Sequence, residues 1–265
     1  MSRPAVIAHR GARLRAPENT IEAFQAAIEA GADAIECDAR LSADGQIVVC
    51  HSAYVDETTD GSGAVSELTF VELRGLDAGA RFNPNGGDFP YRGGGVRVPL
   101  LAEVLELAAG RVWVDVELKN LPGQPGFDSP KEALVEALAR LLAGCPSDSL
   151  VISSFNWVSL ERARELVPGV ATGFLTAPGV DMSVNLAYVR EHGHRICLPH
   201  LEALSRDGGS RAVADARADG RDVMVWTVEE PGQAVDLARL GVTGLIADDP
   251  EAVLAELAAQ GFGSS

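Results

Sequence analysis

The sequence predicts a closed (β/α)8 barrel, the TIM-barrel architecture, built as a single domain over residues 1–265. Short apolar runs alternate along the chain with longer segments whose apolar residues recur at helical spacing, which is the order βαβα. Eight such units fit the 265 residues. An open doubly wound sheet is a poorer match, because no glycine-rich dinucleotide-binding turn is present.

Each predicted strand is followed by a predicted helix. The strands lie near residues 4–8, 33–41, 111–118, 149–154, 170–174, 195–198, 222–227 and 243–247. The helices lie near 20–30, 100–109, 130–143, 157–166, 183–192, 210–219 and 231–240, with a last one after Pro250. Two helix starts carry capping signals, because Asn19 and Glu22 form a capping-box pattern and Asp249 precedes Pro250.

Residues 52–98 interrupt this alternation. They are rich in Gly, Thr, Asp, Asn and Pro, and no barrel helix fits there. The segment follows the second strand, so we expect it over the carboxyl end of the barrel, where catalytic loops gather. We interpret it as an inserted cap that helps to form a pocket, with an inert surface insertion as the alternative.

The charge of the chain restricts its partners. A net charge of -16 at pH 7 opposes a broad electrostatic contact with nucleic acid or with an anionic membrane. A small anionic substrate is compatible with this charge only if a metal ion or a few Arg and Lys side chains reverse the potential inside one pocket.

The cysteines and the apolar runs indicate a cytoplasmic protein. Four cysteines lie far apart without a C-x-x-C pair, which predicts neither a zinc knuckle nor a disulfide framework. Reduced thiols are the simplest interpretation. The first eight residues leave no room for a secretion signal, and no run approaches the roughly 20 apolar residues of a spanning helix. We therefore expect no stable membrane insertion.

Acidic side chains stand near the ends of the second and third predicted strands. Glu36 and Asp38 share one face of the second strand, which in a barrel is the interior, while Cys37 faces the other way. Glu117 lies near the end of the third strand. Acids in one cavity repel each other and persist only with a cation between them or by holding a proton. Oxygen donors alone favour Mg²⁺, Ca²⁺ or Mn²⁺ over zinc.

Basic side chains surround the same region. His9 and Arg10 end the first strand, and Lys119 follows Glu117 toward the rim, where it could hold a phosphate oxygen. A short hairpin strand over residues 47–50 should return His51 toward His9. Two histidines beside a phosphodiester would supply a base and an acid. The alternative is a buried network of ion pairs between the three acids, Arg10 and Lys119.

These residues resemble the signatures of the glycerophosphodiester phosphodiesterase family over nearly the full length of the chain. The amino-terminal part carries His9-Arg10-Gly11, Pro17-Glu18-Asn19-Thr20, Glu36-Cys37-Asp38, Asp44-Gly45 and His51 in the family's order. Similar later blocks are Thr58-Thr59-Asp60-Gly61, Pro99-Leu100-Leu101, Glu117-Leu118-Lys119, Ser153-Ser154-Phe155, Trp226-Thr227-Val228 and the segment from Gly241 to Pro250.

The resemblance implies a metal-dependent enzyme that cleaves glycerophosphodiesters into sn-glycerol 3-phosphate and an alcohol. It implies one divalent cation and a small-molecule substrate. In the family, a neighbouring glycerol hydroxyl is thought to attack first, giving a cyclic phosphate that water then opens. The implied roles are metal ligands at Glu36, Asp38 and Glu117, acid and base at His9 and His51 in either order, and phosphate contacts at Arg10 and Lys119.

Two alternative roles remain open for each of four further residues. Trp226 and Phe155 either pack on the glycerol carbons or belong to the core. Glu18 and Asn19 either cap the first helix or orient Arg10.

The chain departs from the family pattern at three positions: Ser52 and Glu229 stand where Asp and Asn are usual, and Ala247 precedes Asp248 where Thr is usual. Ser52 deprives His51 of a neighbouring carboxylate that would fix its tautomer and raise its pKa. Glu229 could alter the rim that meets the alcohol.

Other functions remain as alternatives. A lysophospholipase D or sphingomyelinase D-like enzyme would use the same two histidines and metal, but should need an apolar channel or a membrane-facing patch. A catalytically silent barrel that binds phosphodiesters would be expected to lack one of these side chains. Barrels that bind phosphate after strands seven and eight more often have glycine-rich loops there, whereas here these loops are acidic.

Overall fold

The computed structural model describes residues 2–84, 86–143 and 147–263, and its strands close into an eight-stranded parallel barrel. The closure is made by β1, which pairs with both β2 and β9. The predicted (β/α)8 fold and its eight strands are confirmed. In circular order the strands are β1 (Ala5–His9), β2 (Ala34–Leu41), β4 (Trp113–Leu118), β5 (Leu150–Ser154), β6 (Ala171–Thr176), β7 (Ile196–Pro199), β8 (Asp222–Val228) and β9 (Gly244–Ala247).

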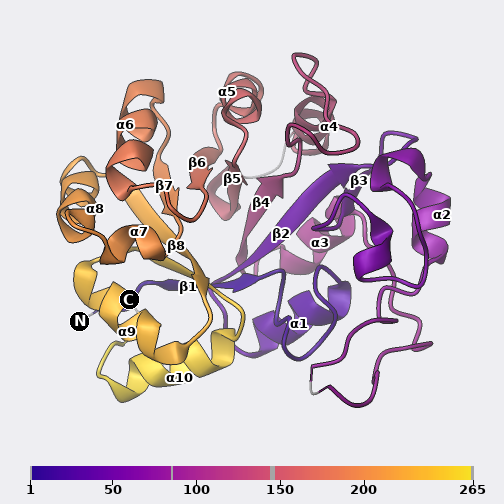
Figure 1. Ribbon diagram of the computed structural model, residues 1–265, viewed down its shortest axis with the longest axis horizontal. Coiled ribbons are helices and arrows are strands. Elements are labelled where there is room, and N and C mark those ends of the chain that lie inside the picture. The colour runs from indigo at the N-terminus through magenta and orange to yellow at the C-terminus, as the bar shows by residue number, and fades with distance from the viewer. Residues whose placement is uncertain (1, 85, 144–146, 264–265) are drawn as a thin grey trace.

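Helices surround the strands, as Figure 1 shows. The helices that connect consecutive barrel strands agree with the predicted ones to within a few residues. They are α1 (Ile21–Glu29), α3 (Leu101–Ala108), α4 (Ala133–Leu141), α5 (Trp157–Leu166), α6 (Met182–His192), α8 (Gly209–Ala218) and α9 (Pro231–Leu240), with α10 (Pro250–Ala259) closing the ring. A short helix, α7 (Glu202–Ser205), and a 3-10 turn, η3 (Ser147–Ser149), lie in connecting loops.

The alternation of side chains along β2 shows how the strands build two cores. Ile35, Cys37 and Ala39 are fully buried and pack outward in the apolar layer beneath the helices. Glu36 and Asp38 belong to the opposite face, which lines the barrel interior. Apolar side chains such as Ile7, Leu198 and Ile246 also face this interior and form a core cluster there.

The segment between β2 and α3 has a small core of its own. It contains the hairpin strand β3 (Ile47–Val49), which pairs antiparallel with β2 as predicted. The helix α2 (Phe70–Gly75) and two 3-10 turns, η1 (Val55–Glu57) and η2 (Val65–Glu67), follow. Buried side chains including Val55, Leu73 and Val98 pack with those of β3. Figure 1 shows β3 beside α2.

The capping prediction for α1 was wrong, whereas that for α10 is confirmed. Thr20, not Asn19, caps α1, because its hydroxyl accepts a hydrogen bond from the Ala23 amide at 3.3 Å. The Asn19 amide group is engaged elsewhere, with Asp38. At α10, the Asp249 carboxylate accepts from the Ala252 amide at 3.1 Å and Pro250 occupies the first turn.

Two further observations concern the environment of the chain. Cys37, Cys50 and Cys197 are free and buried, while Cys145 lies outside the described residues. Within the described ranges, every helix is too short or too polar to cross a membrane.

The turn after β1 requires glycine. Gly11 has a φ of 82°, and a Cβ atom there would lie 2.6 Å from the backbone carbon of Ala23. This close approach lets the chain turn directly from the end of β1 into the loop that precedes α1, which holds His9 and Arg10 at the mouth of the barrel. Gly45, in the β2–β3 turn, has a similar φ of 76° but nothing within 4 Å.

We therefore expect Gly11→Ala to destabilise the protein more than Gly45→Ala. Both substitutions force a left-handed backbone on alanine, at a cost of about 1–2 kcal/mol. Only Gly11→Ala adds a steric overlap, which typically costs about 1–3 kcal/mol more. Urea denaturation of the two variants measures the difference, and equal shifts of the midpoint would contradict it.

Candidate active site

A pocket of about 170 Å³ opens at the carboxyl end of the barrel strands. We call it the acidic pocket. It brings together eight of the eleven predicted site residues. Its lining consists of His9, Arg10, Glu36, His51, Asp115, Glu117, Lys119, Ser153, Phe155, Leu175, Trp226 and Ile246.

A larger cavity, of about 480 Å³, lies at the opposite end, around the amino-terminal residues of the strands. Its charged lining includes Arg195 and Asp222, which pair with each other at 3.1 Å. Active sites of this architecture lie at the carboxyl end, where loops can vary without disturbing the barrel. The acidic pocket is therefore the candidate active site.

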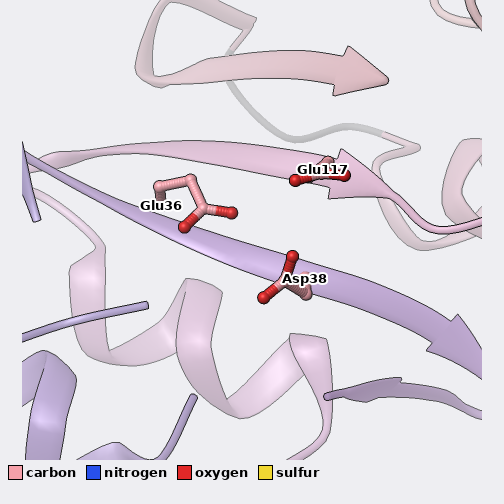
Figure 2. Close-up of side chains that lie close together, drawn as sticks. All are labelled: Glu36, Asp38 and Glu117. Carbon is pink, nitrogen blue, oxygen red and sulfur yellow. The ribbon is translucent and has the colours of Figure 1, made fainter. Parts of the chain in front are cut away.

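Three carboxylates converge in this region. Figure 2 shows Glu36 and Asp38 on β2 beside Glu117 on the neighbouring strand β4. One oxygen from each lies within 4.8 Å of the others, and all three residues are buried. The convergence follows from register, because Asp38 pairs directly with Glu117 and Glu36 pairs with Asp115.

Two cations neutralise part of this charge. The Lys119 ammonium lies 3.0 Å from Asp38 Oδ1 and 2.6 Å from Glu117 Oε1. The Arg10 guanidinium lies 3.4 Å from Asp38 Oδ2, and the Arg10 backbone amide donates to Glu36 Oε2 at 2.9 Å. Arg10 adopts a φ of 57°, which is uncommon for a residue with a side chain and turns its amide toward Glu36.

The pKa values divide the acids into two kinds. Burial acts to raise the pKa of Asp38, but the Lys119 and Arg10 cations outweigh it, so this pKa lies below its ordinary value. Burial and the neighbouring carboxylates hold the pKa of Glu36 well above its ordinary value. Burial also raises the pKa of Glu117, and it raises that of Asp115 to about 7. The pocket is thus short of positive charge.

The ion pairs expected from a buried network are present, but they do not satisfy the cluster. Glu36 Oε1 is buried and has no hydrogen-bond partner in the described part of the chain. Oxygen donors from three carboxylates are the chemistry that hard divalent cations prefer. The three residues could therefore hold a hard divalent cation, whose charge would offset theirs.

His9 is held by an aspartate that the sequence pattern did not single out. Its Nδ1 lies 2.6 Å from Asp248 Oδ1. Arg13 donates to both oxygens of Asp248 at 3.3 Å. Burial lowers the pKa of His9, although Asp248 opposes this shift. The position of Asp248 could have been inferred, because it directly follows β9, which pairs with β1.

His51 has a different environment. Burial, together with the nearby Lys119 and Arg10 cations, lowers the pKa of His51 to about 3 against the opposing Asp38 carboxylate. Across the described residues, none forms a hydrogen bond with its ring. The neighbouring Ser52 donates its hydroxyl hydrogen bond to Glu57 and not to the imidazole. Neither Ser52 nor Glu57 therefore orients the His51 ring.

Glu18 and Asn19 support the site instead of capping α1. Glu18 accepts from Arg10 at 3.1 Å and from Arg13 at 2.8 Å. Asn19 donates to Asp38 Oδ2 at 2.7 Å and accepts from the Asp38 amide at 3.2 Å. Glu18 therefore makes the expected contact with Arg10. Asn19 instead orients Asp38, the carboxylate that lies against the Arg10 guanidinium.

Aromatic side chains line one wall of the acidic pocket. Phe155 and Trp226 pack edge to face, with ring centroids 5.4 Å apart. The indole of Trp226 donates to the Leu198 carbonyl at 3.2 Å, which fixes its plane. Glu229, beyond β8, is exposed and does not belong to this lining.

A barrel that gathers carboxylates, cations and two imidazoles at its carboxyl end has the groups of a hydrolytic enzyme acting on an anionic substrate. The sequence matches the glycerophosphoryl diester phosphodiesterase family over residues 9–252. The chain belongs to this family, as its sequence signatures predicted.

Relatives and solved structures agree with this assignment. The chain is 34% identical over 256 residues to a glycerophosphodiester phosphodiesterase from Caldanaerobacter subterraneus, covering 94% of this chain and 96% of the relative. It is 31% identical over 251 residues to a glycerophosphodiester phosphodiesterase from Bacillus altitudinis, covering 93% and 95%. A phosphodiesterase from Oleispira antarctica, solved in complex with its product sn-glycerol-3-phosphate, aligns with a TM-score of 0.83 at 28% identity, covering 96% and 97%.

Proposed function

We propose that this protein hydrolyses glycerophosphodiesters to sn-glycerol 3-phosphate and an alcohol, using a divalent cation and two histidines. The observation that carries the proposal is the convergence of three carboxylates, two cations and two imidazoles on the acidic pocket of a family member. The product bound to the Oleispira antarctica phosphodiesterase supports the same choice of substrate.

Glu36, Asp38 and Glu117 would hold the cation, Mg²⁺ or Ca²⁺, with Mn²⁺ as a further candidate. When bound, such an ion supplies positive charge that stabilises the transition state and orients the substrate oxygens. Arg10 and Lys119 face the same space and would hold the phosphate, since both already lie against carboxylates whose charge the ion would neutralise.

His9 is the better candidate for the base. Asp248 would accept a hydrogen bond from the protonated Nδ1, which leaves Nε2 free to take a proton from the attacking hydroxyl. As the glycerol hydroxyl forms its new bond to phosphorus, the bond to the alcohol breaks, which leaves a cyclic phosphate. A carboxylate beside the imidazole then stabilises the imidazolium that results. Water then opens the ring: His51 takes the proton of the water, and His9 returns its proton to the glycerol oxygen that leaves phosphorus.

His51 would give its proton to the leaving alcohol. In the free protein its low pKa keeps it neutral. A bound phosphodiester adds negative charge beside Lys119 and Arg10, which would raise the pKa of His51 and let it carry a proton.

Phe155 and Trp226 would pack against the glycerol carbons, because they form the apolar wall of the acidic pocket. We place the reaction in one catalytic domain over residues 1–265, with residues 52–98 as a cap and the cytoplasm as the location. The three free cysteines support the last assignment. No observation on the described residues favours the lipid-cleaving or catalytically silent alternatives.

Metal binding should depend on the three carboxylates. We expect Mg²⁺ or Ca²⁺ to raise the thermal midpoint of the protein, and chelator-treated protein to lose activity on glycerophosphocholine. Glu36→Gln should weaken the ion's binding in calorimetry, because it removes one of three charged donors. Glu191→Gln, an exposed change on α6, is the matched control. Equal ion affinity in both variants would contradict the proposed ligand set.

The roles of the histidines can be separated by the leaving group. We expect His51→Ala to lose at least about a hundredfold in kcat on glycerophosphocholine, the range typical of lost acid–base help. It should lose far less on the p-nitrophenyl ester of glycerol 3-phosphate, whose phenolate needs no proton. His9→Ala should lose activity on both substrates. The reverse pattern would exchange the two roles.

Asp248→Asn tests the orientation of His9. The amide can still hydrogen-bond to Nδ1 but favours the opposite tautomer and does not stabilise the imidazolium. We expect kcat to fall on both substrates, with KM nearly unchanged. A KM effect alone would show that Asp248 serves binding and not proton transfer.

A further inference from the structure

A buried arginine, Arg40, lies behind the acidic pocket and has no assigned role. It follows Asp38 by two residues on β2, so both belong to the same face of the strand. Its relative exposure is only 6%, yet it does not appear in the lining of the acidic pocket. The side chain therefore acts on the protein and not on a ligand in that pocket.

Among the described residues, every hydrogen bond that the Arg40 guanidinium donates goes to a neutral oxygen. Nε and Nη2 donate to the His51 carbonyl at 3.1 and 2.6 Å. Nη1 donates to the Lys119 carbonyl at 3.2 Å, and Nη2 also donates to Gln124 Oε1 at 2.8 Å. One rigid guanidinium thus joins the main chain after β3 to the main chain at the end of β4.

Stability alone does not account for this arrangement. Arg40 is buried, and its four hydrogen bonds end on two carbonyls and one amide oxygen instead of on a carboxylate. A buried cation without a carboxylate in contact contributes little net stability. What a guanidinium offers here is its planar fork, which can hold two carbonyls in a fixed relation, as a lysine ammonium cannot.

The two residues held in this way are those whose relative position the reaction needs. His51 has an imidazole without a hydrogen-bond partner among the residues described, and Ser52 takes the place of the usual aspartate beside it. The position of the main chain then decides which places the ring can reach. Lys119, the other residue held, lies against Asp38 and Glu117.

We propose that Arg40 is a positioning residue that sets His51 at the leaving oxygen relative to the phosphate held by Lys119. The inference rests on the proposed function. The contact between Arg40 and the His51 carbonyl replaces a carboxylate contact on the ring. It fixes the backbone of His51 and so limits the positions that the ring can take.

The test compares Arg40→Ala and Arg40→Lys with Arg92→Ala as matched control. Arg92 also donates through Nε to a backbone carbonyl, that of Ala80 at 2.9 Å, but outside the acidic pocket. Each variant is assayed on glycerophosphocholine and on the p-nitrophenyl ester of glycerol 3-phosphate, after its fold has been checked by circular dichroism.

We expect Arg40→Ala to lose about tenfold to a hundredfold in kcat on glycerophosphocholine, the scale of a displacement of about 1 Å at a reacting group. The loss on the p-nitrophenyl ester should be about tenfold smaller, because that leaving group needs no proton. Guanidinium ion, added far below denaturing concentrations, should restore activity to Arg40→Ala and leave the parent unchanged. Arg40→Lys should keep the defect, and Arg92→Ala should match the parent.

Equal losses on the two substrates, or full activity in Arg40→Lys, would overturn the proposal. If Arg40→Ala fails to fold, Arg40→Lys carries the test, since it keeps the charge and most of the volume. An inactive parent, or a parent whose His51→Ala variant shows no leaving-group dependence, would instead contradict the proposed function.

Discussion

The crowding of carboxylates at the carboxyl ends of β2 and β4 is the constraint on which the rest of the site depends. Register places Glu36, Asp38 and Glu117 within reach of one another, and burial removes the water that would otherwise screen them. Lys119 and Arg10 offset only part of this charge. The surplus negative charge fits the divalent cation that we propose for this pocket, in a chain whose net charge is -16.

The same constraint explains why the charged side chains of the site form hydrogen bonds with residues outside the carboxylate cluster. Asn19 fixes Asp38 through two hydrogen bonds, and Glu18 lies between Arg10 and Arg13. Arg13 also donates a hydrogen bond to Asp248, which is the partner of His9. These contacts form one continuous network around the mouth of the barrel, so the position of each charged group is determined by its neighbours and not by its own rotamer preference alone.

Much of this arrangement could be predicted from local sequence. Period-two spacing placed Glu36 and Asp38 on one face, and the βαβα rhythm gave the eight strands, because both depend on neighbours along the chain. Contacts that depend on closure of the barrel require the strand order as well as the local sequence. Asp248 meets His9 across 239 positions of sequence. Asn19 was misjudged as a cap because its partner, Asp38, lies beyond α1, on β2.

We propose that at Ser52, which stands where an aspartate is usual, a contact to the backbone takes the place of a contact to the His51 ring. A carboxylate beside His51 would orient the ring directly. Here the Ser52 hydroxyl is turned to Glu57, and the fixed element is the His51 carbonyl, bound to Arg40 across the β2–β3 hairpin. Because Arg40 also binds the carbonyl of Lys119, the proposed orientation through the backbone would couple proton transfer to phosphate binding, which a carboxylate on the ring alone would not do.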